Sequence, residues 1–182
     1  PEQSKTEKPS PEKPTSQVEA PIDEDAEKAL LAVPFVHANY ETVSTPKDLD
    51  RWIAEATELG AVAVDTETDS LDSMQAGLVG VSLSTMPGKA CYIPLGHVGE
   101  GGGLFGSEKI AGQIKLEDAI AHLKPLLENP GVLKIGQNLK YDALVLAAHN
   151  ITIAPFDDTM LISYALDAGR GGHGMDELSA KH

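Results

Sequence analysis

Three short runs of β-forming residues follow one another in the first half of the chain, and they limit the possible folds more than any other feature. The runs span 61–67, 78–84 and 90–94, and a Met-Pro-Gly turn at 86–88 joins the last two. Parallel neighbours need a crossover connection of a dozen or more residues, usually a helix, and these connections are too short for one. We therefore expect three strands that pair as antiparallel neighbours.

The rest of the chain alternates between helical and strand patterns. A helix is predicted from Thr45, a favourable N-cap before Pro46, to Gly60, which suits a helix C-terminus. The elements expected after residue 115 are a helix at 116–127, a strand at 132–135, a helix at 139–149, a very short strand at 151–153, a helix at 158–166 and a last helix at 175–181. A meander extended by βα units predicts an α/β fold with a ribonuclease-H-like mixed sheet, three antiparallel strands followed by βα units, flanked by helices.

Composition divides the chain into an acidic tail and a globular body. Residues 1–28 are rich in Pro, Glu, Lys and Ser, so we expect a disordered linker there and a partial domain at 29–182. The formal charge is −14, and the tail, with eight acids and four lysines, accounts for −4 of it. An acidic body argues against a broad basic surface for nucleic acid. Carboxylates that hold divalent cations would still allow contact with a phosphate ester.

The single cysteine, Cys91, cannot form an internal disulfide and indicates a reducing cytoplasm. Because Cys91 lies within a predicted strand, we expect it in the core rather than as a nucleophile. The Gly-rich run at 99–103 lacks the Lys-Ser/Thr of a phosphate-binding loop and is expected to be a flexible connection. No run reaches the roughly 20 apolar residues that span a bilayer, so no membrane partner is expected.

Two carboxylates lie at the end of the first of these strands. Asp65 and Glu67 are two residues apart, so they share one face of the strand while Thr66 points to the other. Adjacent anions raise one pKa or require a cation between them, and hard oxygen ligands on a rigid strand suit Mg²⁺ or Mn²⁺. The alternative is that these acids only end the strand before the turn-rich sequence at 68–70.

A second polar group follows the predicted strand 132–135. Asn138 is placed to cap the next helix, and Asp142 follows one turn later on nearly the same face. The strand delivers this helix start to the edge of the sheet where open α/β sheets place their sites. The alternative is a plain N-cap with Asp142 exposed to water. Further along, Asp158 is expected to cap a helix rather than to take part in chemistry.

Taken together, these stretches resemble a known family. The sequences Val-Asp-Thr-Glu-Thr-Asp-Ser-Leu at 64–71 and Lys-Ile-Gly-Gln-Asn-Leu-Lys-Tyr-Asp at 134–142 resemble the first two exonuclease motifs of bacterial, family A DNA polymerase I. Residues 156–164 resemble the segment that follows those motifs. The matches cover about residues 60–182 in family-like order. The chain is thus similar to the 3′→5′ proofreading exonuclease domain of that family.

The resemblance implies that Asp65, Glu67 and Asp142 are catalytic and bind two divalent metal ions, Mg²⁺ or Mn²⁺. Asp65 would bridge the ions, Glu67 would complete one shell, and Asp142 would hold the second ion through water. The implied reaction is hydrolysis of the 3′-terminal nucleotide of DNA by in-line displacement. The residues implied in binding the single-stranded 3′ end are Thr66, Leu71, Asn138 and Tyr141.

The resemblance also implies a setting in a larger protein. The partners would be a C-terminal polymerase domain and an N-terminal 5′-nuclease domain, in a cytoplasmic, nucleoid-associated enzyme. The family has a third motif, a Tyr followed by an Asp four residues later, and Tyr164 and Asp167 do not have that spacing. We therefore expect a truncated domain, weak or inactive in isolation. Two alternatives stay open, a structural domain that has lost the chemistry and an RNA 3′ exonuclease such as ribonuclease D.

Overall fold

The computed structural model describes residues 39–99 and 110–181, together with residues 25, 28, 29, 32 and 36. The chain divides into two units, Pro1–Ala32 and Val33–His182, and the second contains all the elements given below. Almost all of the expected tail at 1–28, and all but the first residue of the Gly-rich run at 99–103, lie outside the described residues. Within the described part of the chain, no helix is long and apolar enough to cross a membrane.

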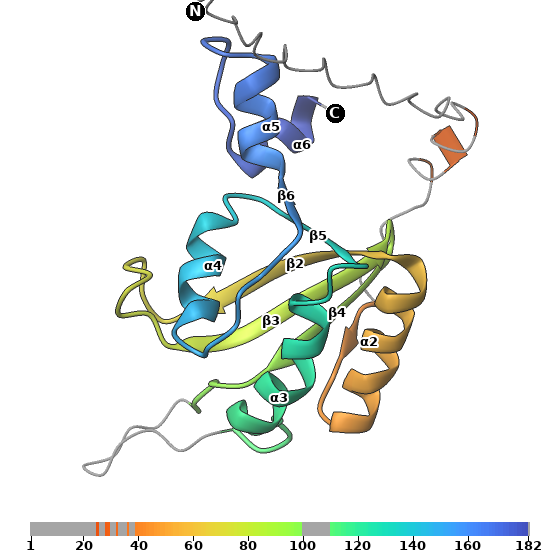
Figure 1. The fold of residues 1–182 in the computed structure, drawn as a ribbon, viewed down its shortest axis with the longest axis vertical. Helices are drawn as coiled ribbons and strands as arrows, with labels where there is room; N and C mark the ends of the chain where they lie inside the picture. Colours follow the sequence, from red (N-terminus) through yellow and green to blue (C-terminus); the bar gives the residue numbers. More distant parts are fainter. Residues whose placement is uncertain are drawn as a thin grey trace, which may run out of the picture. The chain divides into compact units, whose positions relative to one another are not determined.

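A mixed sheet, six-stranded in the part of the chain described here, forms the centre of the second unit (Figure 1). Its order is β1-β4-β3-β2-β5-β6. Strand β3 pairs antiparallel with both β2 and β4, whereas β1–β4, β2–β5 and β5–β6 are parallel pairs. This arrangement confirms the predicted antiparallel meander extended by βα units. The strands are β1 (Glu41–Thr42), β2 (Ala61–Thr68), β3 (Leu78–Met86), β4 (Lys89–Pro94), β5 (Leu133–Gly136) and β6 (Phe156–Asp158).

Helices α2 and α3 pack side by side, and α2 also packs against the sheet (Figure 1). The predicted ends of α2 are confirmed, because the Thr45 side chain accepts a hydrogen bond from the Asp48 N–H and Gly60 has a positive φ of 73°. Trp52 of α2 is only 2% exposed, so this helix contributes a large apolar side chain to the core. The helices are α2 (Pro46–Leu59), α3 (Leu116–Leu127), α4 (Lys140–Ala147), α5 (Thr159–Leu166) and α6 (Met175–Lys181).

The central strands have two different faces because successive side chains alternate across a sheet. One face is buried in the hydrophobic core together with side chains of α2 and α3, and we call it the core face. The opposite face carries the acids of β2, and we call it the carboxylate face. The core face includes Val62, Val64, Thr66, Val81, Leu83, Cys91 and Ile93, and the carboxylate face includes Ala63, Asp65, Glu67, Gly80, Ser82, Ser84, Ala90 and Tyr92.

Two expectations about the sheet were wrong or incomplete. Residues 151–153 do not form a strand; the strand is β6, which pairs in parallel with β5. Ile151 and Ile153 are buried, which explains the apolar alternation, but the Ile151 N–H bonds to the Leu146 carbonyl rather than to a strand. The short strand β1, which pairs with β4, was not expected, since two residues give no detectable pattern.

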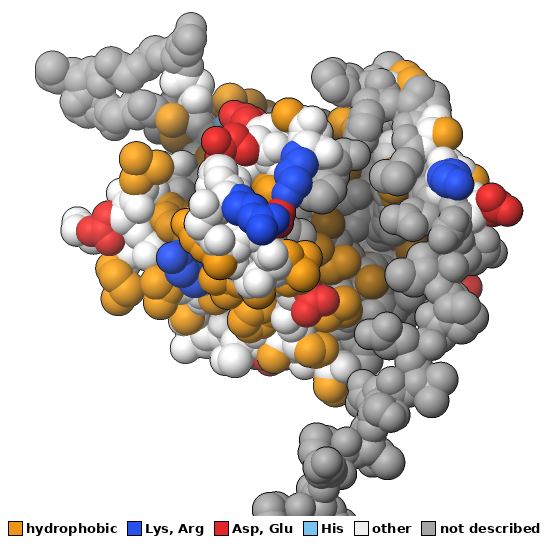
Figure 2. Space-filling view, turned by 90° about the horizontal axis from the view of Figure 1, so that it is seen from above, with side chains coloured by type: hydrophobic (Ala, Val, Ile, Leu, Met, Phe, Trp, Pro, Cys, Tyr) orange, Lys and Arg blue, Asp and Glu red, His pale blue; other side chains and the backbone are white. Residues whose placement is uncertain are grey.

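Apolar side chains are exposed on α5 and α6. Figure 2 looks at the molecule from above and shows apolar side chains among a few basic and acidic ones on the face seen there. The exposed large apolar residues of these two helices are Leu161, Ile162, Tyr164, Leu166 and Met175.

Candidate functional site

The two acids of β2 point away from the core, as the alternation predicts. Asp65 is partly buried and Glu67 is exposed, whereas Thr66 between them is buried on the core face. Strand β2 lies inside the sheet: it pairs with β5 at residues 61–63 and with β3 at residues 63–68, so the backbone of both acids is held by β3. The acids therefore stand on a rigid element beside the start of the helix that follows β5.

Asp142 of α4 reaches the same strand from the other side. Its carboxylate is only 3% exposed, so the alternative of an Asp142 exposed to water is wrong. One oxygen, Oδ1, accepts hydrogen bonds from the Thr66 N–H at 2.9 Å and the Thr66 hydroxyl at 2.5 Å. These residues are 76 positions apart in the sequence. The expected meeting of a strand end and a helix start is thus present, and Thr66 joins them.

The carboxylates lie close enough for their charges to interact. Burial raises the pKa of Asp65, and the negative charges of Asp142 and Glu67 raise it further. Burial also raises the pKa of Asp142, although the hydrogen bonds from Thr66 favour its ionised form and oppose that rise. A cation near these groups would relieve both the repulsion and the desolvation.

The donor set fits a hard divalent cation, because all three groups are carboxylates and two of them are crowded anions. Among the residues that the structure describes, no group of three or more His, Cys, Asp or Glu side chains already stands in an arrangement that could hold an ion. Asp142 has one oxygen engaged by Thr66, so only its second oxygen is left to act as a ligand.

Asp158 organises the start of α4 in a way that the sequence did not indicate. The expected capping of α4 by Asn138 is wrong: Asn138 has a positive φ of 58°, and the N-cap is Leu139, which has no capping side chain. The Asp158 carboxylate instead accepts from the N–H groups of Asn138 and Leu139 at 3.1 and 2.9 Å. It also caps α5, its predicted role, by accepting from the N–H groups of Met160 and Leu161.

The residues expected to bind the single-stranded 3′ end line one cavity. Its volume is about 490 Å³, and Leu71 at its edge is 99% exposed. The Tyr141 hydroxyl is hydrogen-bonded to the Thr68 hydroxyl and to the Ser70 carbonyl, so it holds the turn that carries Leu71. The Asn138 Oδ1 atom is buried without a partner in the described part of the chain. The lining residues are Thr66, Glu67, Thr68, Asp69, Ser70, Leu71, Asn138 and Tyr141.

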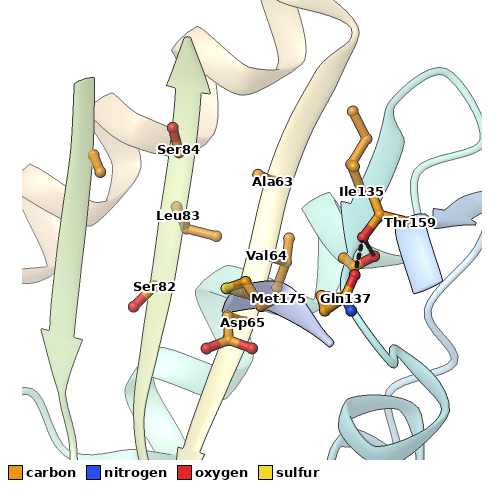
Figure 3. Close-up of a pocket in the computed structure, with 12 residues that line it drawn as sticks. Ala63, Val64, Asp65, Ser82, Leu83, Ser84, Ile135, Gln137, Thr159 and Met175 are labelled. Atoms are coloured by element: carbon orange, nitrogen blue, oxygen red, sulfur yellow. Dashed lines mark hydrogen bonds between the residues drawn. The ribbon is translucent and has the colours of Figure 1, made fainter. Parts of the chain in front are cut away.

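A second cavity of about 290 Å³ lies beside Asp65 on the carboxylate face (Figure 3). Figure 3 shows Gln137 and Thr159 hydrogen-bonded to each other on one side and Ser82 and Asp65 on neighbouring strands. Met175 of α6 also lines this cavity. Gln137, Thr159 and Met175 were not among the site residues expected from the sequence, although Gln137 stands within the second motif.

Comparisons with known proteins place the chain in a family. A family model described as 3′-5′ exonuclease matches residues 40–182. The chain is 50% identical over 163 residues to a DNA polymerase I of Rhizobium leguminosarum, a match covering 85% of this chain and 16% of that relative. The chain belongs to this 3′-5′ exonuclease family, and it spans about a sixth of the relative's length.

Solved structures show the same fold. The POL domain of Pol1 from M. smegmatis, in complex with DNA primer-template and dNTP, superposes with a TM-score of 0.59 at 20% identity, covering 77% of this chain and 22% of that one. Brucella melitensis NrnC with bound Mg²⁺ gives a TM-score of 0.55 at 23% identity, covering 78% and 58%. The predicted ribonuclease-H-like fold class is therefore confirmed.

Proposed function

We propose that this chain is the proofreading exonuclease domain of a DNA polymerase I and removes the 3′-terminal nucleotide of DNA. The observation that carries the proposal is the pair of hydrogen bonds from Thr66 to Asp142, which joins the two motifs in a chain 50% identical to a DNA polymerase I. That identity favours the polymerase over the alternative of a ribonuclease D-like RNA exonuclease.

Asp65, Glu67 and Asp142 would hold two divalent ions, Mg²⁺ or Mn²⁺. When bound, such ions supply Lewis-acid activation of the phosphate and of the attacking water. Mg²⁺ in the Brucella NrnC structure supports this choice. Thr66 engages Oδ1 of Asp142 and leaves its other oxygen for the ion. Burial and the neighbouring negative charges destabilise the ionised form of Asp65, so cation binding is favoured.

The cavity beside Glu67 would receive the terminal nucleotide of a single-stranded 3′ end. Leu71 is exposed at the edge, where an apolar side chain can wedge against a base. The unpartnered Oδ1 of Asn138 offers a buried acceptor for a donor of the sugar or base. Tyr141 holds the turn that presents Leu71. A polymerase domain and a 5′-nuclease domain would be the partners within the whole enzyme, as a relationship to DNA polymerase I supports.

Calorimetric titration of the chain with Mn²⁺ tests the ion site. Saturable binding that is lost in Asp65→Ala and kept in Asp157→Ala, an exposed acid on β6, is the expected result. Equal, weak binding in all three proteins would contradict the proposal and favour a structural domain that has lost the chemistry.

The substrate is tested by fluorescence anisotropy with 5′-labelled single-stranded DNA and RNA of the same sequence. We expect tighter binding of DNA, weakened by Leu71→Ala because the apolar contact with the terminal base is lost. Preference for RNA would instead support the ribonuclease D-like alternative.

A further inference from the structure

A tyrosine of β4 lies on the carboxylate face, near Glu67. In the antiparallel register, Glu67 of β2 is directly opposite Gly80 of β3. The side chain of Tyr92 crosses Gly80 so closely that a Cβ at position 80 would be 2.0 Å from the tyrosine hydroxyl. The hydroxyl therefore takes the place of the side chain that Gly80 lacks.

This position makes the hydroxyl a cross-strand neighbour of Glu67. Residues directly opposite on one face of an antiparallel pair have Cβ atoms about 4.5–5.5 Å apart. The Tyr92 hydroxyl occupies that neighbouring position, within reach of a glutamate carboxylate. Electrostatics agree with the geometry: burial raises the pKa of Tyr92, and the negative charge of Glu67 raises it further.

The hydroxyl is held in place by His97. Its oxygen is 2.6 Å from Nε2 of His97, and the two rings meet edge to face at 5.6 Å. The backbone of His97 is fixed in turn by the Gln113 side chain, which accepts from the His97 N–H at 2.7 Å and donates to its carbonyl at 2.8 Å. Tyr92 is thus held by His97, whose backbone is held in turn by Gln113.

We propose that Tyr92, held by His97, is a positioning residue for Glu67 and limits the conformations of its carboxylate before an ion binds. The inference rests on the proposed function, because Glu67 matters here as an ion ligand. Glu67 is exposed, and a glutamate loses much rotamer freedom when it is fixed. With the Nε2–H tautomer, His97 donates to the tyrosine oxygen, and the tyrosine proton is directed to Glu67.

A double-mutant cycle on Mn²⁺ affinity tests this role. The full chain, Tyr92→Phe, Glu67→Gln and the double variant are titrated by calorimetry. We expect Tyr92→Phe to weaken Mn²⁺ binding about ten-fold or more, as for loss of one hydrogen bond to a charged group. In the Glu67→Gln background, the same change should have no further effect, because Tyr92 acts through Glu67. Tyr164→Phe, which removes a hydroxyl on α5, is the matched control and should bind like the parent chain.

The outcomes separate the inference from the proposed function. An equal effect of Tyr92→Phe in both backgrounds would mean a general structural role and would overturn the inference. No effect in either background would overturn it as well. If Glu67→Gln itself binds Mn²⁺ like the parent chain, the proposed ion site fails first. Phenylalanine keeps the ring that crosses Gly80, so thermal unfolding of Tyr92→Phe should stay close to that of the parent.

Discussion

The two faces of the sheet carry different kinds of side chain in this chain and have different roles. On the core face, Val64 and Leu83 are buried among apolar side chains of the helices. On the carboxylate face, one residue further along each strand, stand Asp65 and Ser84. Because strand side chains alternate, a single strand contributes to stability with every second residue and holds acids for chemistry with the others. Residues that stabilise the core and residues that hold acids are thus neighbours in sequence but lie on opposite faces of the sheet.

The largest expected contrast between the faces concerns thiol reactivity. Burial raises the pKa of Cys91 on the core face to about 12 from 9.0. At pH 8 its thiolate fraction, and hence its rate with a disulfide reagent, should be about a thousandfold lower than in the unfolded chain. The double variant Cys91→Ala/Ala90→Cys moves the thiol to the carboxylate face, where it should react readily. Equal rates of thiol reaction in the parent chain and the double variant would contradict the assignment of residues 90 and 91 to opposite faces.

A core truncation should show the next largest effect. Leu83 is 1% exposed, so Leu83→Ala should lower the free energy of unfolding by about 3 kcal/mol through lost burial and a cavity. Ser82→Ala, the neighbouring residue on the carboxylate face, should change it by less than about 0.5 kcal/mol. Urea unfolding of both variants measures the difference, and similar losses would contradict the assignment of these residues to opposite faces.

Asp158 links the core to the site. Its carboxylate accepts hydrogen bonds from four backbone N–H groups at the starts of α4 and α5. Asp158→Ala should therefore lower the free energy of unfolding by about 2 kcal/mol, since buried donors lose their acceptor. Asp157→Ala is the matched control, because Asp157 is exposed on the same strand. If both substitutions have equal effects on urea unfolding, Asp158 does not hold these helices.

The smallest effect is a gain in stability on the carboxylate face. The pKa of Asp65 is raised in the folded state, so the folded chain binds more protons than the unfolded chain between 3.8 and that raised value. Stability contributed by Asp65 therefore falls as pH rises through this window. In EDTA at pH 7, Asp65→Asn should raise the free energy of unfolding by about 0.5 kcal/mol, small because water screens a partly exposed charge.

The gain should shrink as pH falls through the window above 3.8, and it should disappear well below 3.8, where the acid is protonated in both states. Asp157→Asn, at an exposed acid of β6, is the matched control at pH 7. If Asp65→Asn instead lowers the free energy of unfolding at pH 7, other groups of the chain already stabilise the charge of Asp65. The carboxylate face would then carry no unfavourable charge for a cation to relieve.

The sequence by itself determined most of the elements, and it determined the motifs. Thr45 and Gly60 mark the ends of α2 because capping depends on neighbouring residues. Alternation placed Asp65 and Glu67 on one face, and the same local pattern predicted the meander. The similarity of the two motifs to exonuclease motifs could likewise be recognised from short runs of consecutive residues. All of these features depend on neighbours within a few positions along the chain.

Only the tertiary structure decided which distant groups meet. Asp142 bonds to Thr66, Asp158 accepts from the N–H of Asn138, 20 residues earlier, and Tyr92 crosses a glycine to lie near Glu67. These contacts depend on the order and register of the strands. Local hydrophobic patterns allow many orders and registers, so the sequence pattern could not select among them. The packing of the whole sheet makes that selection, and the site exists as a consequence of it.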